Sequence, residues 1–417
     1  MRIRFFNPPV FNVVGQHYRL NQAVGGPLLS AILRQTGHDA SYVDAEALRW
    51  NLNRVADYLC KEGVEAIGVT VTNLNWEASR QFIAHIKGHL PHIWIAVGGP
   101  EVTARPADAR MLGADCVAPG EGDASIVFIF EDKPGYYQPD GVVRDLDSLP
   151  MPAWEYSLPL PTKYMGNMPR FESPEVCTLW NRGCAHKCTF CSNPVFNRVL
   201  IRERSPGNIL EELRKLKILG AKHIFVYSDE LIGMSPRQAE WLGQVCEAII
   251  KADLGLTFKT QGRCSPHATE EVLMLMARAG FKAIMWGIES MAPNVLQAVK
   301  KGITPEDVWA TLEASHKAGI ANWGFFMVGM PEETQADFAL TVQALAEMKQ
   351  RGLLQWQQVN ICTPSPGTEL WRQATENGWL KVSIPSAAGH FHQVPVMEFP
   401  YASQQEIKTR LAVLQAL

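Results

Sequence analysis

The chain lacks the features of a disordered, nucleic-acid-binding or membrane-spanning protein. Hydrophobic residues make up 47% and charged residues 19% of its 417 residues, a balance that excludes a disordered chain and is typical of globular proteins. The net charge is −3 and lysine or arginine form no run, so nucleic acid is not an expected partner. No apolar segment is long enough for a secretion signal or a membrane span, and we therefore expect a cytoplasmic protein.

The nine cysteines do not fit a disulfide framework. Their number is odd and no secretion signal accompanies them, so free thiols in a reducing compartment are expected. Cys60, Cys116 and Cys246 have apolar neighbours and are interpreted as small buried hydrophobic residues. Cys264 and Cys362 stand alone, so the sequence shows no motif for a second metal cluster.

The amino-terminal third, residues 1–145, alternates short apolar runs with helical stretches. This pattern is typical of a parallel sheet covered by helices. It predicts strands near 3–6, 39–45, 66–72, 93–100 and 114–122, with helices starting near 26 and spanning 77–89. We therefore expect an α/β domain with a doubly wound, Rossmann-like sheet whose ligands bind at the carboxyl ends of the strands.

The remaining two thirds resume the alternation with a longer period. Residues 146–170 are rich in proline, show little periodicity and are interpreted as a linker. Six strand–helix units at 171–367 predict a partial (β/α)6 barrel, with strands near 175–180, 223–230, 256–263, 283–290, 321–331 and 356–367. Residues 368–417 form a carboxyl-terminal segment that either packs on the barrel or closes over it as a substrate lid.

Three cysteines crowd the loop after the first barrel strand: Cys184, Cys188 and Cys191. Three thiolates can anchor a four-iron cluster and leave one iron free to hold a small molecule. A zinc site would need a fourth ligand, for which His186 is the nearest candidate, but this spacing differs from the usual paired C-x-x-C knuckles. Purely structural thiols would have little reason to gather in one loop.

With Phe190 before the last cysteine, this loop resembles the C-x-x-x-C-x-aromatic-C motif of radical S-adenosylmethionine (SAM) enzymes. The stretches "FVYSDELI", "GIESMAPNVLQAVKKGIT", "FMVGMPEET" and "TPSPGTELW" follow in the order and spacing of that family. The amino-terminal "GPLLSAILRQTGH", "VGGPEVTARP" and "PGEGD" are similar to the cobalamin-binding domain of its cobalamin-dependent (class B) subgroup. The resemblance covers nearly the whole chain.

This resemblance implies a 4Fe-4S cluster on the three cysteines, with SAM on the open iron. An external donor of the flavodoxin or ferredoxin type would supply the electron that cleaves SAM to a 5′-deoxyadenosyl radical. Phe190 would pack beside the adenine of SAM, or else only cap the loop. The other implied SAM contacts lie at the ends of barrel strands and are Ser228, Asp229, Glu230, Arg263, Glu289, Ser290 and Gly329.

Each of these residues has an implied role. The 228–230 stretch would accept a hydrogen bond from the ammonium group of SAM, and Arg263 would bind its carboxylate as a fork. Glu289 and Ser290 would hold the ribose hydroxyls, while Gly329 would leave room for the adenine. The alternative for Arg263 and Glu289 is an ion pair between barrel residues.

The resemblance also implies contacts to the corrin and its nucleotide tail from strand-end loops of the first domain. These contacts are assigned to Thr72, Asn73, Gly98, Gly99 and Glu121. The loop after the first strand lacks the D-x-H-x-x-G motif whose histidine replaces the lower corrin base, a departure that fits the radical SAM subgroup. His17 lies in this loop, and a lone histidine of this kind is more often a surface residue than a cobalt ligand.

The pairing of the two domains predicts cobalamin-dependent methyl transfer to an unactivated carbon. No peptide-binding extension is evident, so a small molecule, such as a natural-product intermediate, is the expected substrate. Two SAM molecules would be consumed per methylation, yielding 5′-deoxyadenosine and S-adenosylhomocysteine. The alternatives are a non-methylating dehydration, ring contraction or cyclisation, and a cobalamin-binding sensor without catalysis. An RNA methylthiotransferase is discounted because its extra cysteines and its basic carboxyl-terminal module are missing.

Overall fold

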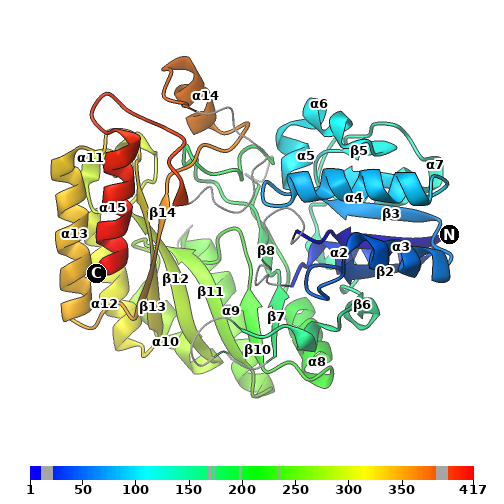
Figure 1. Cartoon of the computed structure of the whole chain (residues 1–417). Coiled ribbons are helices and arrows are strands. Elements are labelled where there is room, and N and C mark those ends of the chain that lie inside the picture. Colours follow the sequence, from blue (N-terminus) through cyan, green and yellow to red (C-terminus); the bar gives the residue numbers. More distant parts are fainter. Residues whose placement is uncertain (11–21, 167–170, 172–173, 197–199, 233–234, 382–392) are drawn as a thin grey trace.

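Two parallel sheets of six strands each form the frame of the chain (Figure 1). The computed structural model describes residues 1–10, 22–166, 171, 174–196, 200–232, 235–381 and 393–417. Each sheet carries helices, and the two α/β units lie side by side, with the chain passing once from the first to the second. The predicted α/β fold is confirmed, while the exact domain boundaries remain a prediction.

The first sheet has the strand order β5-β4-β3-β1-β2-β6, and every pair is parallel. Strand order reverses between β1 and β3, and such a switch point is where ligands of doubly wound sheets bind. The strands are β1 (Arg2–Asn7), β2 (Asp39–Asp44), β3 (Ala66–Thr70), β4 (Trp94–Gly98), β5 (Cys116–Ala118) and β6 (Ser157–Leu158).

Successive side chains of each strand point to opposite faces of this sheet, and apolar residues occur on both. Helices therefore cover both faces. Phe5 and Phe6 of β1 are both buried but belong to different clusters, one on each side of the sheet. One face is covered by α2 (Gly25–Gln35) and α7 (Ile126–Asp132), and the other by α3 (Leu52–Lys61) and α4 (Trp76–His89). The short helices α5 (Pro100–Ala104) and α6 (Pro106–Ala109) follow β4.

The stretch interpreted as a linker contributes the edge strand β6 to the first sheet. Ser157 pairs with Tyr42 and Leu158 with Val43, so residues 146–170 are in part integral to that sheet. A two-residue strand has no measurable period, which is why the sequence pattern does not reveal it. Cys60 differs from expectation as well, because it is exposed on α3 whereas Cys116 and Cys246 are buried.

The second sheet follows chain order, which is the arrangement of a partial barrel. Its strands are β7 (Glu175–Thr178), β10 (His223–Val226), β11 (Thr257–Arg263), β12 (Phe281–Glu289), β13 (Ala321–Val328) and β14 (Trp356–Ile361). The helices between them are α8 (Pro206–Ile218), α9 (Pro236–Ala252), α10 (Glu270–Ala279), α11 (Pro293–Ala298), α12 (Pro305–Lys317) and α13 (Gln335–Gln350). The five helices α8, α9, α10, α12 and α13 begin at a serine or threonine whose hydroxyl caps the first turn.

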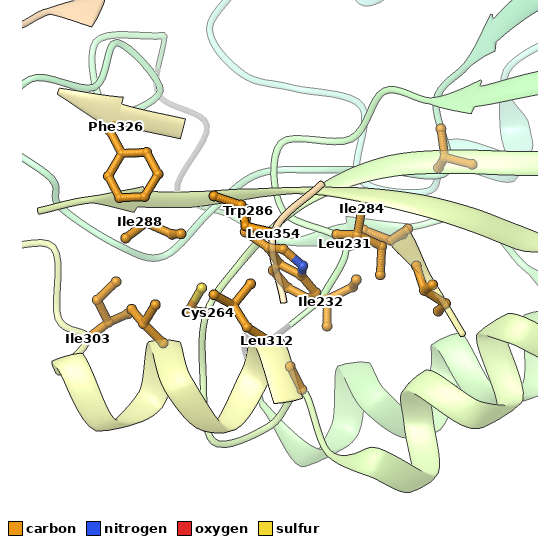
Figure 2. Packing of buried hydrophobic residues seen from close by; sticks show 14 of the residues in the cluster. Leu231, Ile232, Cys264, Ile284, Trp286, Ile288, Ile303, Leu312, Phe326 and Leu354 are labelled. Atoms are coloured by element: carbon orange, nitrogen blue, oxygen red, sulfur yellow. The ribbon is translucent and has the colours of Figure 1, made fainter. Parts of the chain in front are cut away.

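Alternation along each barrel strand separates an outer core from an inner lumen. Trp286 and Ile288 on β12 and Phe326 on β13 point toward the helices, where they pack with Leu312 of α12 (Figure 2). Residues at the intervening positions, including Phe225 and Met285, form a separate cluster inside the barrel. Lys259 is buried in this lumen, forms a 2.9 Å ion pair with Glu175 and lies over the Phe225 ring.

The carboxyl-terminal helix α15 (Gln404–Ala416) packs against β13 and β14 and follows the short helix α14 (Glu369–Glu376). Its Arg410 forms a buried 3.0 Å ion pair with Glu333, in the turn before α13. Residues 382–392, which include the first part of the stretch considered as a lid, lie outside the described residues. Within the described part of the chain, no helix has the length and apolar character to cross a membrane.

Asp44 at the end of β2 ties the connection between the two units to the first sheet. Its carboxylate accepts hydrogen bonds from Asn7 Nδ2 at 2.9 Å, Ala47 N at 3.0 Å and Tyr164 Oη at 2.7 Å. Tyr164 belongs to the connecting segment, and its carbonyl accepts a 3.0 Å hydrogen bond from Glu175 N at the start of β7, so it links the first sheet to the second. Burial is the largest influence on this carboxyl, and it raises the pKa of Asp44 above the ordinary aspartate range.

We predict that Asp44→Asn changes the pH dependence of stability. Because the pKa of Asp44 is raised in the fold, its protonated form is favoured there, and the free energy of unfolding falls as pH rises through that raised value. For each pH unit by which folding raises the pKa of Asp44, the free energy of unfolding of the unsubstituted chain falls by about 1.4 kcal/mol over this pH range. Asparagine does not ionise, so the Asp44→Asn chain is expected to show no such fall. Urea unfolding of both chains from acidic to neutral pH measures this difference, and two parallel stability curves would contradict the prediction.

Candidate cofactor site

The three cysteines lie in one loop whose ends are held together by a two-stranded sheet. Residues 183–201 connect β8 (Asn181–Arg182) to β9 (Arg202–Glu203), which pair in antiparallel fashion. Gly183 has a φ of +97°, and a Cβ at this position would lie 2.1 Å from the Leu200 carbonyl oxygen, so only glycine fits the crossing. Cys188 is buried, and Cys184 and Cys191 are partly buried.

Side chains from the ends of β10 and β11 reach this loop. Asp229 accepts a 2.7 Å hydrogen bond from Gly183 N, one residue before the first cysteine. Arg263 Nη1 donates to Cys188 Sγ at 3.7 Å. The structure therefore brings two of the predicted SAM-binding residues to the cluster loop, at the carboxyl end of the barrel where functional groups gather.

Several polar atoms around the loop are buried without a hydrogen-bond partner within the described structure. They include Ser228 Oγ, Arg263 Nη2, His186 Nε2 and Thr189 Oγ1. Buried polar atoms are nearly always paired, so a group of orphans beside three cysteines indicates a place for a bound polar group. Burial also raises the pKa of Cys184 to about 12 and raises that of Cys191, so both thiols are protonated until a metal displaces the proton.

Three thiols in one loop are the donor set of a 4Fe-4S cluster that keeps one iron open. Among the described residues, no three His, Cys, Asp or Glu side chains converge closely enough to hold one metal ion. The zinc interpretation with His186 needs four such donors around a point. A 4Fe-4S cluster binds each cysteine to a different iron, so the chemistry of this donor set fits a cluster.

Glu230 links the strand ends beneath the loop. Its carboxylate accepts hydrogen bonds from Ile232 N at 2.9 Å and Arg263 N at 3.4 Å, while its carbonyl accepts one from Asn181 Nδ2 at 2.6 Å. Burial is the main cause that raises the pKa of Glu230 to about 7. These contacts give Glu230 a role in shaping the end of the barrel, and its contact with SAM remains a prediction.

Glu289 forms an ion pair, and its partner is a residue that the sequence analysis did not single out. Lys301 Nζ lies 2.7 Å from Glu289 Oε1, is buried and stands 5.9 Å from the centre of the Phe190 ring. The nearby Cys188 and Glu289 raise the pKa of Lys301 although burial opposes them. Lys301 therefore places a positive charge beside the cysteine loop. One feature of the sequence could have identified Lys301 as a site residue. It lies in "KKGIT", at the end of a stretch that resembles the family pattern.

Ser290 and Gly329 have packing reasons for their identity. Ser290 Oγ lies 3.3 Å from Thr341 Oγ1 and accepts a hydrogen bond from Ala292 N. Gly329 has a φ of +73°, and a Cβ there would lie 2.9 Å from Ile407 of α15. The space beside Gly329 is thus occupied by a helix, and the proposed SAM contacts of both residues remain predictions.

The residues assigned to cobalamin lie at the carboxyl ends of β3, β4 and β5. Thr72 N donates to Asn75 Oδ1 at 2.7 Å, and Asn73 follows in the same loop. Gly98 ends β4, and Gly99 has a φ of +101°, with Val71 O 2.9 Å from where its Cβ would be. Close backbone packing therefore suffices to explain Gly99. His17 lies outside the described residues.

Glu121 borders a cavity of about 410 Å³ between the first sheet and the cluster loop. Thr103 and Gly120 line it from the first unit, together with residues 138–142, and Val195 and Phe196 line it from the cluster loop. Glycine at position 120 keeps the wall open, since a Cβ would reach 3.2 Å from Pro139. This cavity lies at strand ends of the first sheet, where doubly wound sheets bind their ligands.

Two family models match the chain in the places that this geometry indicates. The radical SAM superfamily model covers residues 179–345, and the B12 binding domain model covers residues 18–127. The chain combines a radical SAM domain with a B12 binding domain. The two domains indicate a 4Fe-4S cluster, SAM and cobalamin as cofactors of this radical SAM enzyme.

Curated relatives match most of this radical SAM enzyme. An uncharacterized methyltransferase of Pyrococcus horikoshii is 25% identical over 91% of this chain and 84% of its own length. The hopanoid C-3 methylase of Methylococcus capsulatus is 24% identical over 88% of this chain and 72% of its own. The anaerobic magnesium-protoporphyrin IX monomethyl ester cyclase of a Synechocystis species is 24% identical over 84% and 72%, respectively.

Solved structures support the fold. The radical SAM methyltransferase TsrM of Kitasatospora setae, solved with cobalamin and a 4Fe-4S cluster, superposes with a TM-score of 0.70. That match has 17% identity over 98% of this chain and 85% of TsrM. The cobalamin-dependent enzyme OxsB gives a TM-score of 0.75 at 17% identity, over 100% of this chain and 66% of OxsB.

We predict that each cysteine of the loop is needed for the cluster. Cys184→Ala, Cys188→Ala and Cys191→Ala each remove one ligand, so the reconstituted chain is expected to lose most of its iron and its SAM cleavage. Cys246→Ala is the control, because Cys246 is buried in the outer core of the barrel and away from the loop. Iron and sulfide analysis after anaerobic reconstitution measures the outcome. Full iron content in any of the three loop variants would contradict the prediction.

Proposed function

We propose that this enzyme transfers a methyl group from cobalamin to an unactivated carbon of a small molecule. The observation that carries the proposal is the shared cavity, since Gly120 and Glu121 of the B12-binding domain and Val195 and Phe196 of the cluster loop line the same space. Such an arrangement suits chemistry that uses both cofactors at one substrate. Relatives named methyltransferase and methylase agree with it.

When bound, the cluster and cobalamin supply the electron that cleaves SAM and the methyl group that is transferred. The protein's part is to hold and orient these groups. Cys184, Cys188 and Cys191 would hold the cluster, while Arg263 and Lys301 provide positive charge beside it. Arg263 Nη2, buried and unpaired among the described residues, is available to the SAM carboxylate.

The lumen below the loop supports an uncharged, largely apolar substrate. Gln261 is two residues before Arg263 on the same face of β11, and it is in register with Met285, Trp323 and Trp356 on the following strands. Tyr227, half exposed, follows β10 beside this row. The next row toward the loop holds Phe325 and Gln358. Aromatic faces and amide groups bind a flat molecule with few polar atoms.

Two ion pairs neutralise four of the charged residues around this lumen. Lys259 and Glu175 form a buried pair below the aromatic row, and Glu289 pairs with Lys301 near the loop. A substrate carboxylate or phosphate in the middle of the lumen would therefore lose its hydration without gaining a free cation. Trp323 Nε1, which has no partner among the described residues, is a donor for one substrate oxygen or nitrogen.

The alternative function is non-methylating radical chemistry, such as a cyclisation. It is favoured by the cyclase relative, whose match spans 84% of this chain. The two functions differ in what happens to the methyl group of SAM, so product analysis separates them.

We predict that substrate methylation yields 5′-deoxyadenosine and S-adenosylhomocysteine in equal amounts. The reconstituted enzyme, supplied with cobalamin, a flavodoxin-type reductant and SAM carrying a CD₃ group, would be incubated with apolar and polar fractions of a bacterial small-molecule extract. Mass spectrometry is expected to find a CD₃-labelled product in the apolar fraction. The Cys188→Ala variant is the control for unspecific labelling. Deoxyadenosine without S-adenosylhomocysteine would favour the cyclase-type alternative.

A further inference from the structure

The neck of the cluster loop presents two arginines side by side. In the sheet formed by β8 and β9, Arg182 pairs directly with Arg202, and the cysteines lie in the loop between them. Like charges directly opposite each other destabilise a strand pair, and a two-stranded sheet this short is marginal by itself. The neck therefore needs something else to hold it closed. In Figure 1, β8 lies between the two α/β units.

A single carboxylate of the B12-binding domain binds both arginines. Arg202 Nη2 lies 2.7 Å from Glu121 Oε1 and Arg202 Nη1 lies 2.9 Å from Oε2, which is a bidentate pair. Arg182 Nη1 lies 3.2 Å from the same Oε2, and Arg182 also contacts Asp123. Two cations thus face two anions, and the four side chains are at most 9% exposed.

This network fixes more than the neck itself. Gly183 directly follows Arg182, crosses against Leu200 and is bound by Asp229, so the position of Cys184 follows from that of the neck. Glu121 also lines the cavity between the two domains. One side chain therefore connects the wall of that cavity to the base of the cysteine loop.

We propose that Glu121 is a positioning residue that holds the cluster loop in place from the neighbouring domain, through Arg182 and Arg202. The placement of the cluster against the B12-binding domain then depends on this carboxylate and not only on the barrel. The proposal rests on cluster binding by the three cysteines and is independent of methyl transfer. It gives Glu121 a function that its predicted corrin contact does not include.

The test compares Glu121→Gln with Glu333→Gln in the full chain, reconstituted anaerobically with iron and sulfide. Both substitutions replace a buried carboxylate that binds arginine by a neutral side chain of similar shape, and the pair of Glu333 with Arg410 lies on the α15 side of the barrel. Hydrogen exchange of peptides covering 181–203 and the EPR spectrum of the reduced cluster with SAM are the readouts. Neither requires a substrate, so failure of this proposal is distinct from failure of the proposed function.

Glu121→Gln is expected to speed exchange at the neck about tenfold or more, as loss of charge-assisted hydrogen bonds implies, and to alter the EPR spectrum. Glu333→Gln is expected to lower global stability and to leave exchange at the neck unchanged. Its EPR spectrum is not used as a control, because Glu333 also accepts a hydrogen bond from Gly329 N, at a predicted SAM contact. A folded Glu121→Gln chain with normal neck exchange and a normal spectrum would overturn the proposal.

A double variant separates positioning from stability alone. Glu121→Gln with Arg202→Gln also removes the cation left unpaired by the single substitution, so the unfolding midpoint is expected to recover. If Glu121 positions the loop, exchange at the neck stays fast and the EPR spectrum stays altered although stability returns. Recovery of all three measurements together would reduce Glu121 to a stabilising residue and overturn the proposal. This variant also serves if Glu121→Gln alone does not fold.

Discussion

The ion-pair network of Glu121 with Arg182 and Arg202 is the contact on which the arrangement of the cofactor site depends. A cluster loop needs an open side for SAM and substrate, so it cannot be packed into the barrel on every face. The barrel holds it from one side through Asp229 and Arg263. The other side is held by the first domain, because the buried arginines of the neck find their counter-charge there.

The same need to join the two units explains the other contacts of the connecting segment. Strand β6 extends the first sheet, Tyr164 binds Asp44 at the end of β2, and Trp154 donates to Glu212 of α8 in the barrel. The two side-chain contacts, of Tyr164 and of Trp154, join groups that are buried and polar, so each has a defined geometry and a high cost if broken. A connection fixed in this way keeps the ligand-binding ends of the two parallel sheets in one relative orientation, as an enzyme with two large cofactors requires.

The sequence was most informative where structure is local. Apolar runs predicted the strands of both sheets except β6. The cysteine spacing predicted the cluster loop for the same reason, since its ligands are close together in the chain. The neck arginines were missed because Glu121 lies 61 residues from Arg182 and 81 residues from Arg202, and neither hydrophobic periodicity nor motif spacing indicates a pairing between such distant residues. Lys301 was missed although its partner Glu289 is only 12 residues away, because only the family pattern pointed to it. The helix α15 was missed too, because its few buried residues do not stand out in a polar sequence.

For Glu121 the sequence predicts a corrin contact, and the structure adds an ion-pair network that the sequence did not predict. A carboxylate in a strand-end loop of a doubly wound sheet predicts a ligand contact, and the cavity beside it agrees with that expectation. Its buried carboxylate oxygens, however, are bound to arginines from β8 and β9. A packed apolar contact would hold two domains together at least as strongly as a buried ion network. What the network adds is direction, because a bidentate arginine–carboxylate pair tolerates little rotation or sliding. Charge at this boundary is therefore better explained by the need for one fixed orientation of the cluster loop than by stability.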